Sequence, residues 1–294
     1  MIPQVFHSIL EIRDTLKKFR AAGESVGLVP TMGALHAGHG QLIETARREC
    51  DRIVASIFVN PIQFNRADDY DLYPRTLSSD VEFCAARNVD LIFAPSVDEM
   101  YPRPQRAFVD VTEVSDHLCG KFRPGHFRGV ATVVMKLLNI VQPDRAYFGE
   151  KDAQQVAIIQ RMCADLNVPV QIVEVPTVRE MDGLALSSRN QRLSATERLI
   201  APVLHQALKT AEELIANGAT DAREVKREAM RVIERNHGLR MEYFEIVSPG
   251  DMQPVETVTG PVRVAGAIWI GETRLIDNVL CVPGRTLPAQ AAIG

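Results

Sequence analysis

The sequence predicts an α/β protein whose first two-thirds form a parallel sheet and whose last third forms a smaller α+β domain. Strand-like and helix-like segments alternate up to about residue 188, which is typical of a parallel sheet covered by helices on both faces. Beyond that point, two helical segments are followed by three strand-like segments, which favours an antiparallel sheet. We therefore expect a first domain over residues 1–187 and a second over residues 188–294.

The first domain contains five strand-like segments. The segment at 53–60 is almost entirely apolar, as expected of a strand that is buried on both faces. The other four lie at 25–30, 90–94, 146–149 and 170–175. Apolar residues at helical spacing predict one helix from about Gly129 and another after Asp152. Their apolar faces carry Val130, Val133, Val134, Leu137, Leu138 and Val141 in the first helix, and Val156, Ile159, Cys163 and Leu166 in the second.

The second domain begins with helix signals. Ser194 and Glu197 have the spacing of a capping box, and Pro202 marks either the true helix start or a kink. A further helix from about Asp221 is expected to end at Gly238, because glycine is common just beyond a helix C-terminus. The three expected strands cover 241–247, 262–270 and 274–282.

Composition excludes several classes of protein. Hydrophobic residues make up 46% and charged residues 24%, which is typical of a globular protein with a core. The sequence has no apolar stretch of membrane-spanning length and no signal-peptide pattern at its start, so we expect a cytoplasmic protein without a membrane partner. The net charge of −4 argues against a dedicated nucleic-acid binder. Five scattered cysteines without a CxxC pair are expected to be reduced and to serve mostly in packing. The tail at 287–294 is expected to be disordered.

The segment at 30–39, PTMGALHAGH, connects the first predicted strand to a helix that we expect to begin near Gly40. His36 and His39 are three residues apart and can lie on one side of the first helical turn. Free backbone amides and the helix dipole favour an anion there, and imidazole N–H groups can donate to a polyphosphate. A capped turn with two surface histidines, or a metal site without an evident third ligand, are the alternatives.

Three further polar segments carry candidate ligands. Gln63 follows the second strand and suits hydroxyl and carboxylate groups. Lys151 can reach phosphates, whereas Asp152 can cap a helix or hold a ribose hydroxyl or a metal ion. The Ser-Ser-Arg sequence at 187–189 offers phosphate ligands close to the expected domain boundary. Each segment is also compatible with an ordinary polar loop, charged turn or linker.

Most of these segments come directly after predicted strands. Open α/β sheets bind ligands beyond the carboxyl ends of their strands, so this placement predicts a Rossmann-like, nucleotide-binding sheet. The basic, glycine-containing stretch at 121–129 is compatible with a mobile flap over an anionic ligand and equally with a solvated loop.

Taken together, these segments resemble the pantothenate synthetase family of HxGH nucleotidyltransferases. The matching stretches follow the family's order from about residue 30 to 190 and read PTMGALHAGH, SIFVNPIQF, YPRT, RPGHFRGV, PDRAYFGEKDAQQ and VPTVREMDGLALSSRN. This ordered set is far more specific than HxGH alone, which class I aminoacyl-tRNA synthetases share. A tRNA synthetase is disfavoured because the last third shows no evident basic anticodon-binding domain.

The resemblance implies an ATP-dependent ligase that condenses pantoate with β-alanine. Pantoate would attack the α-phosphate to give pantoyl adenylate and pyrophosphate, and β-alanine would then displace AMP. The resemblance further implies Mg²⁺ carried mainly by the ATP phosphates, and a homodimer. On the residues alone, a nucleotidyltransferase that releases an adenylated cofactor and a non-catalytic nucleotide-binding module both stay open.

The resemblance also implies roles for individual residues. His39 matches the general acid, His36 matches a nucleotide contact, and the charge of Lys151 would stabilise the triphosphate. Gln63 and Gln155 match pantoate ligands, and Gln63 is shared with β-alanine. The matched ATP contacts are Met32, Gly33, Ala34, Leu35, His36, Ala37, Gly38, His39, Gly149, Glu150, Lys151, Asp152, Val178, Leu186, Ser187, Ser188 and Arg189.

Two positions depart from the family pattern. Gly40 stands where the family commonly has a bulky residue, and glycine in a helix costs up to about 1 kcal/mol relative to alanine. We therefore expect Gly40 to loosen the helix that carries His39. Leu186 replaces the usual methionine and preserves the apolar volume.

Overall fold

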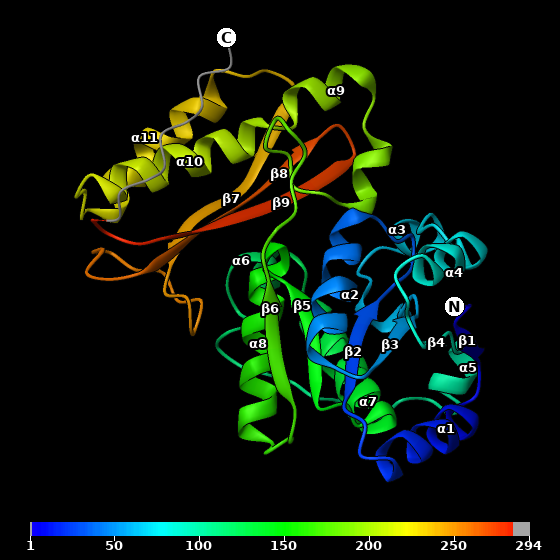
Figure 1. Ribbon diagram of the computed structural model, residues 1–294. Helices are drawn as coiled ribbons and strands as arrows, with labels where there is room; N and C mark the ends of the chain where they lie inside the picture. Colours follow the sequence, from blue (N-terminus) through cyan, green and yellow to red (C-terminus); the bar gives the residue numbers. More distant parts are fainter. Residues whose placement is uncertain (1, 285–294) are drawn as a thin grey trace. The chain divides into compact units, whose positions relative to one another are not determined.

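Two sheets organise the chain, and the computed structural model of the protein describes residues 2–284 (Figure 1). These residues divide into two compact units. The first unit holds the residues up to 116, 120–178 and 186–188, and the second holds 117–119, 179–185 and the residues from 189 onward. The tail at 287–294, which was expected to be disordered, lies outside the described residues.

A six-stranded parallel sheet lies in the first unit, in the spatial order β1-β4-β3-β2-β5-β6. Its strands are β1 (Gln4–Phe6), β2 (Val26–Thr31), β3 (Arg52–Ile57), β4 (Leu91–Phe93), β5 (Arg145–Gly149) and β6 (Gln171–Val175). This confirms the predicted parallel sheet, and each predicted strand lies close to an observed one. β1 escapes prediction because its three residues precede a charged helix and are too few to show a strand pattern.

The chain reverses its direction of winding at β2. β3 and β4 follow β2 on one side, whereas β5 pairs with β2 on the other side. The carboxyl ends of β2 and β5 therefore lie next to each other at the point where the strand order reverses. Ligands of open α/β sheets bind at such a position.

Both faces of the sheet are buried, because alternate side chains of each strand point to opposite faces. Ile53 and Ile92 pack with Ile43 of α2 on one face, and Leu28 and Val54 are fully buried on the other. The helices of this part of the chain are α1 (Ile9–Ala21), α2 (Ala37–Glu49), α3 (Ala67–Asp71), α4 (Leu77–Ala85), α5 (Val97–Met100), α6 (Leu118–Phe122), α7 (His126–Val141) and α8 (Ala153–Asp165).

The two long helices predicted from apolar spacing are α7 and α8. All six predicted apolar residues of α7 are buried, as are Val156, Ile159 and Cys163 of α8. The prediction that Leu166 belongs to the apolar face of α8 is wrong, because Leu166 follows the last residue of the helix and is exposed. The apolar face of α8 therefore ends one turn earlier than its spacing predicts.

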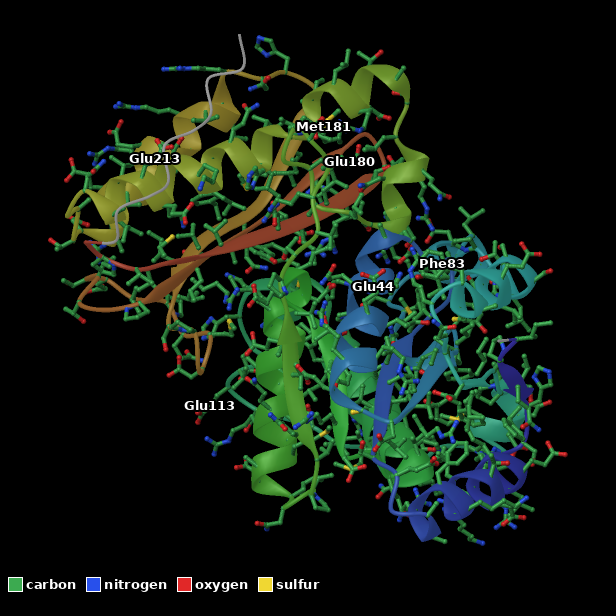
Figure 2. The ribbon with its side chains drawn as sticks, viewed as in Figure 1. Glu44, Phe83, Glu113, Glu180, Met181 and Glu213 are labelled. Carbon is green, nitrogen blue, oxygen red and sulfur yellow. The ribbon has the colours of Figure 1, made fainter. Side chains whose placement is uncertain are left out.

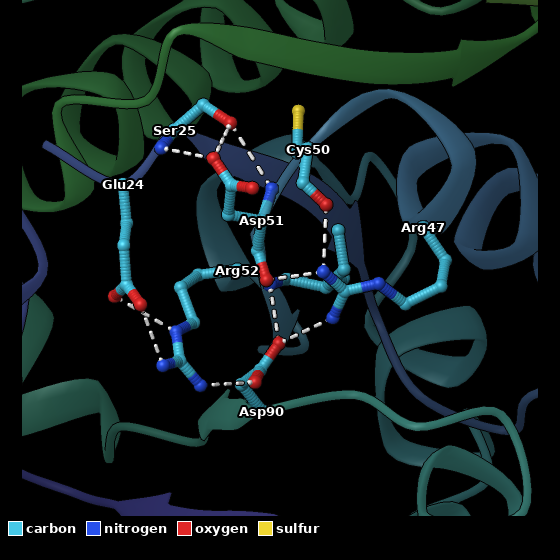
Figure 3. A network of polar contacts seen from close by, with 8 residues as sticks. Glu24, Ser25, Arg47, Cys50, Asp51, Arg52 and Asp90 are labelled. Carbon is cyan, nitrogen blue, oxygen red and sulfur yellow. Dashed lines mark hydrogen bonds and ion pairs between the residues drawn. The ribbon is translucent and has the colours of Figure 1, made fainter.

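A network of ion pairs joins the amino ends of three strands (Figure 3). Arg52, the first residue of β3, contacts Glu24 at 2.7 Å and Asp90 at 3.1 Å. Asp90 also contacts Arg47 at 2.8 Å and accepts a hydrogen bond from the Ile53 N–H at 2.7 Å. Because Glu24 precedes β2 and Asp90 precedes β4, the network fastens β2, β3 and β4 at the edge opposite their carboxyl ends.

The second unit contains a three-stranded antiparallel sheet with helices packed on it, which confirms the predicted α+β layout. Its strands are β7 (Leu239–Val247), β8 (Val262–Ile270) and β9 (Thr273–Cys281), and its helices are α9 (Ala195–Ile200), α10 (Val203–Ala216) and α11 (Ala222–Glu234). The core combines Leu204 and Leu208 of α10 with Val225 of α11, Phe244 of β7 and Ile268 of β8.

The helix boundaries of this unit test the sequence signals. Ser194 and Glu197 form the predicted capping box at the start of α9. Pro202 directly precedes α10, so it marks a helix start rather than a kink. The predicted end of α11 at Gly238 is wrong: the helix ends at Glu234, and Gly238 has a φ of +84° in the turn before β7.

A hairpin at 179–185 belongs to this second unit. Arg179 pairs with Ala185 across the hairpin, and its guanidinium contacts the buried Asp277 carboxylate through two hydrogen bonds of 2.6 and 2.9 Å. Arg198 binds the acidic side of the hairpin, including Glu180, which is labelled in Figure 2. Ion pairs within the second unit therefore hold this short segment at Arg179 and at Glu180.

The five cysteines are free and buried, as expected of packing residues. Within residues 2–284, no helix combines the length and the apolar character needed to cross a membrane.

Candidate active site

The HxGH segment links β2 to α2. The helix begins at Ala37, rather than near Gly40 as predicted, because His36 caps it. The His36 Nδ1 atom accepts a hydrogen bond from the Gly38 N–H at 3.2 Å, and the His39 Nδ1 atom accepts one from the His36 N–H at 3.3 Å. The two histidines thus form a reciprocal capping box and fix each other's rings.

This arrangement decides which nitrogen of each ring carries the proton. Each Nδ1 atom accepts a backbone N–H, so the proton of each neutral ring lies on Nε2. The ring centroids are 4.2 Å apart, so the two rings lie side by side. A Cβ atom at Gly38 would lie 2.9 Å from the His36 ring, which explains the glycine between the histidines.

Both histidines are held in the neutral form. Burial lowers the pKa of His36 to about 4 and that of His39 to about 3. The positive charge of Lys151 lowers the pKa of both rings further, because the end of β5 lies beside the end of β2. At neutral pH the pair therefore presents two uncharged Nε2–H donors next to a lysine.

The segment after β5 supplies that lysine. Lys151 lies in the short 3-10 helix η2 (Glu150–Asp152), and its Nζ atom is 3.6 Å from the Asp152 carboxylate. In the described part of the chain, the Asp152 side chain makes no capping hydrogen bond to α8, so the capping alternative is wrong. A Cβ atom at Gly149 would meet no described atom within 4 Å, so this turn borders open space.

Gln63 lies beside the HxGH segment. It ends the 3-10 helix η1 (Pro61–Gln63) after β3, and its Nε2 atom donates to the Met32 sulfur at 3.0 Å. The Asn60 amide donates to the Gln63 Oε1 atom at 3.0 Å, and the Tyr101 hydroxyl donates to Asn60 at 2.8 Å. A thioether is a weak acceptor, so the Gln63 amide is oriented but poorly satisfied.

Two neighbouring glutamines of α8 differ in their surroundings. Gln154 is buried and donates to the Val114 carbonyl at 2.9 Å, which is a structural contact. Gln155 is half-buried. The difference favours Gln155 as the residue that is accessible to a small molecule.

Val178 and Leu186 form a pair within the first unit. The Leu186 N–H donates to the Val178 carbonyl at 3.0 Å. A Cβ atom at Gly38 would lie 4.0 Å from the Leu186 Cβ atom, so this pair lies beside the HxGH turn. Ser187 and Ser188 follow in the same unit, whereas Arg189 belongs to the second unit.

The basic stretch at 121–129 is only in part a loop. Its last four residues form the first turn of α7. The His126 side chain is buried, and its Nδ1 atom lies 2.8 Å from the Gln63 carbonyl oxygen. A Cβ atom at Gly129 would lie 2.4 Å from the Ile62 carbonyl oxygen, so only glycine allows this close packing. For these residues both the flap and the solvated-loop interpretations are wrong, because they support the backbone of Gln63.

A metal ion held only by the protein finds little support. Among residues 2–284, no group of three or more His, Cys, Asp or Glu side chains is placed to hold one. His36 and His39 therefore remain without a third protein ligand, and an anion between their Nε2–H groups and Lys151 fits the geometry better.

Comparison with known proteins identifies the family. The sequence model of pantoate-β-alanine ligase matches residues 4–280. The chain belongs to the pantoate–β-alanine ligase family. The resemblance predicted from the sequence is thereby confirmed, and the chain is a ligase that joins pantoate to β-alanine.

Close relatives of this ligase cover almost the whole chain. A pantothenate synthetase of Thermotoga petrophila is 50% identical over 276 residues, which cover 92% of this chain and 99% of that protein. The crystal structure of pantothenate synthetase from Thermus thermophilus has a TM-score of 0.89 at 45% identity, covering 94% of this chain and 98% of that one. The ligase of Francisella tularensis, crystallised with β,γ-ATP and β-alanine, has a TM-score of 0.79 at 34% identity, covering 95% and 97%.

Gly40, which departs from the family pattern, has a structural explanation. It is buried in the first turn of α2, and a Cβ atom there would lie 2.7 Å from Arg87 Nε. The Arg87 guanidinium also stacks 3.7 Å above the Phe83 ring and lies 3.5 Å from Glu44; both partners are labelled in Figure 2. Arg87, which follows the C-terminus of α4, thus occupies the space that a bulky residue would fill.

Sequence reasoning missed several residues of this candidate site. Asn60 and Tyr101 orient Gln63, and the buried Asp80 binds the HxGH loop. Asn60 stands inside the matched SIFVNPIQF stretch, which was the available signal for it. Asp80 and Tyr101 act through contacts that are distant in the sequence, so no local pattern marks them.

We predict that both histidines stay neutral at mildly acidic pH in the free enzyme. An ordinary imidazole, with a pKa of about 6.5, is mostly protonated at a pH of about 5.5. Nitrogen NMR of labelled histidine should show His36 and His39 still uncharged there, with the proton on Nε2. Between the unfolded pKa of about 6.5 and the lower pKa values in the folded protein, the two imidazoles bind protons only in the unfolded chain. The free energy of unfolding should therefore fall as the pH drops from about 6.5 towards 4. A ring that titrates near 6.5 would contradict the assignment.

We predict that Gly40 and Arg87 are energetically coupled. Gly40→Leu alone should lower the free energy of unfolding by about 1–3 kcal/mol, because the new side chain overlaps the guanidinium. In the Arg87→Ala background the same change should be tolerated, since the space is vacant. Urea unfolding of the four proteins measures the coupling, with Arg87→Ala as the control. Strictly additive effects would show that the two residues do not share this space.

Proposed function

We propose that this ligase activates pantoate with ATP at the carboxyl ends of β2 and β5 and then transfers the pantoyl group to β-alanine. The carboxylate of pantoate attacks the α-phosphate, which forms pantoyl adenylate and releases pyrophosphate. The amine of β-alanine then attacks the acyl carbon, the amide bond forms, and AMP leaves. The observation that carries the proposal is the pair of neutral Nε2–H donors beside Lys151 at the reversal point of the sheet.

The proposed roles of the charged and polar groups follow from where negative charge develops. Charge on the triphosphate rises as the carboxylate attacks and pyrophosphate departs, so donors aimed at it stabilise the transition state most. His36, His39 and Lys151 would supply those donors. The bound triphosphate would also raise the pKa of His39 from its value in the free enzyme, which would make it competent as a general acid.

Gln63 and Gln155 are proposed to hold the small substrates. The Gln63 Oε1 atom accepts a hydrogen bond from Asn60, and the Nε2 atom donates to the weak Met32 sulfur acceptor, which a hydroxyl or carboxylate of pantoate would replace. Gln155 is the accessible member of the glutamine pair on α8. The family resemblance supports both assignments.

The remaining ATP contacts are proposed from the resemblance and from their positions. The HxGH loop, the turn at 149–152 and the Val178–Leu186 pair belong to the first unit, and Ser187 and Ser188 follow them. Arg189 is proposed as a phosphate ligand because its guanidinium suits an anion. We keep residues 1–187 as the proposed ATP- and pantoate-binding domain and 188–294 as the proposed capping domain.

We propose that Mg²⁺ enters the site bound to ATP and is not held permanently by the protein. Magnesium usually keeps waters and binds substrate phosphates with one or two carboxylates, and the half-exposed Asp152 carboxylate next to Lys151 suits that role. When bound, the ion would neutralise charge on the phosphates.

We also propose that the enzyme is a homodimer in the cytoplasm, on the basis of the family resemblance and the character of the sequence. A molecular mass of one chain in analytical ultracentrifugation would contradict the dimer.

The reaction class is tested by its products. Incubation with ATP, Mg²⁺, pantoate and β-alanine should release AMP and pyrophosphate in equal amounts, together with pantothenate. Without β-alanine, mass spectrometry should detect pantoyl adenylate on the enzyme. Formation of ADP and phosphate would contradict an adenylate intermediate.

His39→Ala and Lys151→Ala should each slow adenylate formation by about 10²- to 10³-fold in single turnover, because each removes one donor to the developing charge. Both variants should still join supplied pantoyl adenylate to β-alanine at close to the normal rate, since that step releases no pyrophosphate. Normal adenylate formation with a defect only in the joining step would show that these roles are wrong.

A further inference from the structure

A buried carboxylate lies directly beneath the HxGH loop. Asp80, in the first turn of α4, is only 2% exposed. Its Oδ2 atom accepts a hydrogen bond from the Ala34 N–H at 3.1 Å, and its Oδ1 atom accepts one from the Leu35 N–H at 2.8 Å. The Thr76 hydroxyl donates a third at 3.1 Å to Oδ2.

These partners set Asp80 apart from the other well-buried carboxylates of the chain. Arginine side chains form ion pairs with Asp90 and Asp277, whereas Asp80 accepts its hydrogen bonds from two backbone amides and a hydroxyl. A buried charge is costly unless its acceptors are satisfied, so the carboxylate and the loop depend on each other. If the loop moved, both oxygens would lose hydrogen-bond donors while the side chain stays buried.

The loop needs such support because its backbone is unfavourable. Gly33 and Ala34 have φ values of +82° and +51°, which is the left-handed region. For alanine this conformation costs about 1–2 kcal/mol. A Cβ atom at Gly33 would lie 3.0 Å from Asp80 Oδ2, so the loop lies tightly against the carboxylate.

The loop leads directly into the two histidines. Leu35 precedes His36, whose N–H holds the His39 ring and whose own ring is held by the Gly38 N–H. A shift of the Ala34–Leu35 backbone would therefore turn both Nε2–H groups. We infer that Asp80 is a positioning residue, whose buried carboxylate fixes the HxGH loop and so aims the His36 and His39 donors at the triphosphate.

This inference rests on the proposed function, and it places Asp80 behind the loop rather than in contact with substrate. Both carboxylate oxygens are engaged by the loop and the side chain is closed to solvent. The alternative is a ligand of the Mg²⁺ that accompanies ATP. The two roles differ in how the reaction depends on magnesium concentration.

The test is Asp80→Asn, with Asp90→Asn as the matched control. In either orientation, the asparagine amide group would face a backbone N–H that has lost its acceptor. Asp90, which is drawn in Figure 3, also binds a backbone amide and is largely buried, but it directly precedes β4 and so lies at the opposite end of the strands. Both variants should unfold at lower temperature than the parent protein.

Only Asp80→Asn should impair the chemistry. Its kcat for adenylate formation should fall about 10²-fold, as expected of misplaced catalytic groups, whereas Asp90→Asn should stay within about twofold of the parent. Asp80→Asn should keep its KM for β-alanine, join supplied pantoyl adenylate normally and require no more Mg²⁺. Equal kcat values for the two variants, or recovery of Asp80→Asn at high Mg²⁺, would overturn the inference.

A milder pair of variants covers the case in which Asp80→Asn does not fold. Thr76→Val removes one of the three hydrogen bonds and should lower kcat about threefold to tenfold, while Thr76→Ser keeps the hydroxyl and should retain the parent rate. Identical rates for these two would also overturn the inference. Normal adenylate formation by His39→Ala, in contrast, would reject the proposed role of the histidine donors, and release of ADP and phosphate by the parent enzyme would reject the proposed adenylate mechanism.

Discussion

The pairing of β2 with β3 on one side and with β5 on the other is the constraint on which the rest of the site depends. Parallel register brings the carboxyl ends of all three strands to one edge of the sheet. The residues that follow are an imidazole pair after β2, an amide after β3 and a lysine after β5. These groups are distant in sequence and meet because the winding reverses at β2, while the ion pairs around Asp90 fasten the strands at their other end.

The candidate site combines one charged donor, Lys151, with two imidazole donors that are held neutral. Two imidazoles 4.2 Å apart could both be charged only against strong repulsion, and burial together with Lys151 keeps them neutral. Neutral donors can still bind an anion when the backbone fixes their tautomer. Because their pKa values respond to nearby charge, the strength of these donors depends on what occupies the site. A cluster of arginines would bind phosphate in every state with similar strength.

The sequence predicts those parts of the fold and site that are encoded locally. Apolar spacing marks α7 and α8, and the HxGH segment shows itself through glycines and histidines between a strand and a helix. The predicted start of α2 near Gly40 is wrong because histidine is not among the usual capping residues. The role of His36 as the cap depends on how the preceding turn folds. Asp80 is unpredictable for another reason: its partner Ala34 lies 46 residues earlier, and only the packed sheet brings them together.

The hairpin at 179–185 limits how this protein can be divided. The chain leaves the first unit after Val178, folds with the second unit through Arg179 and Asp277, and returns by Leu186. The residues on either side of this excursion are hydrogen-bonded to each other. The units are therefore interleaved along the chain, and no single break separates them. Exchange of the second unit between related proteins would have to preserve several junctions at once, so we expect the two units to be inherited together.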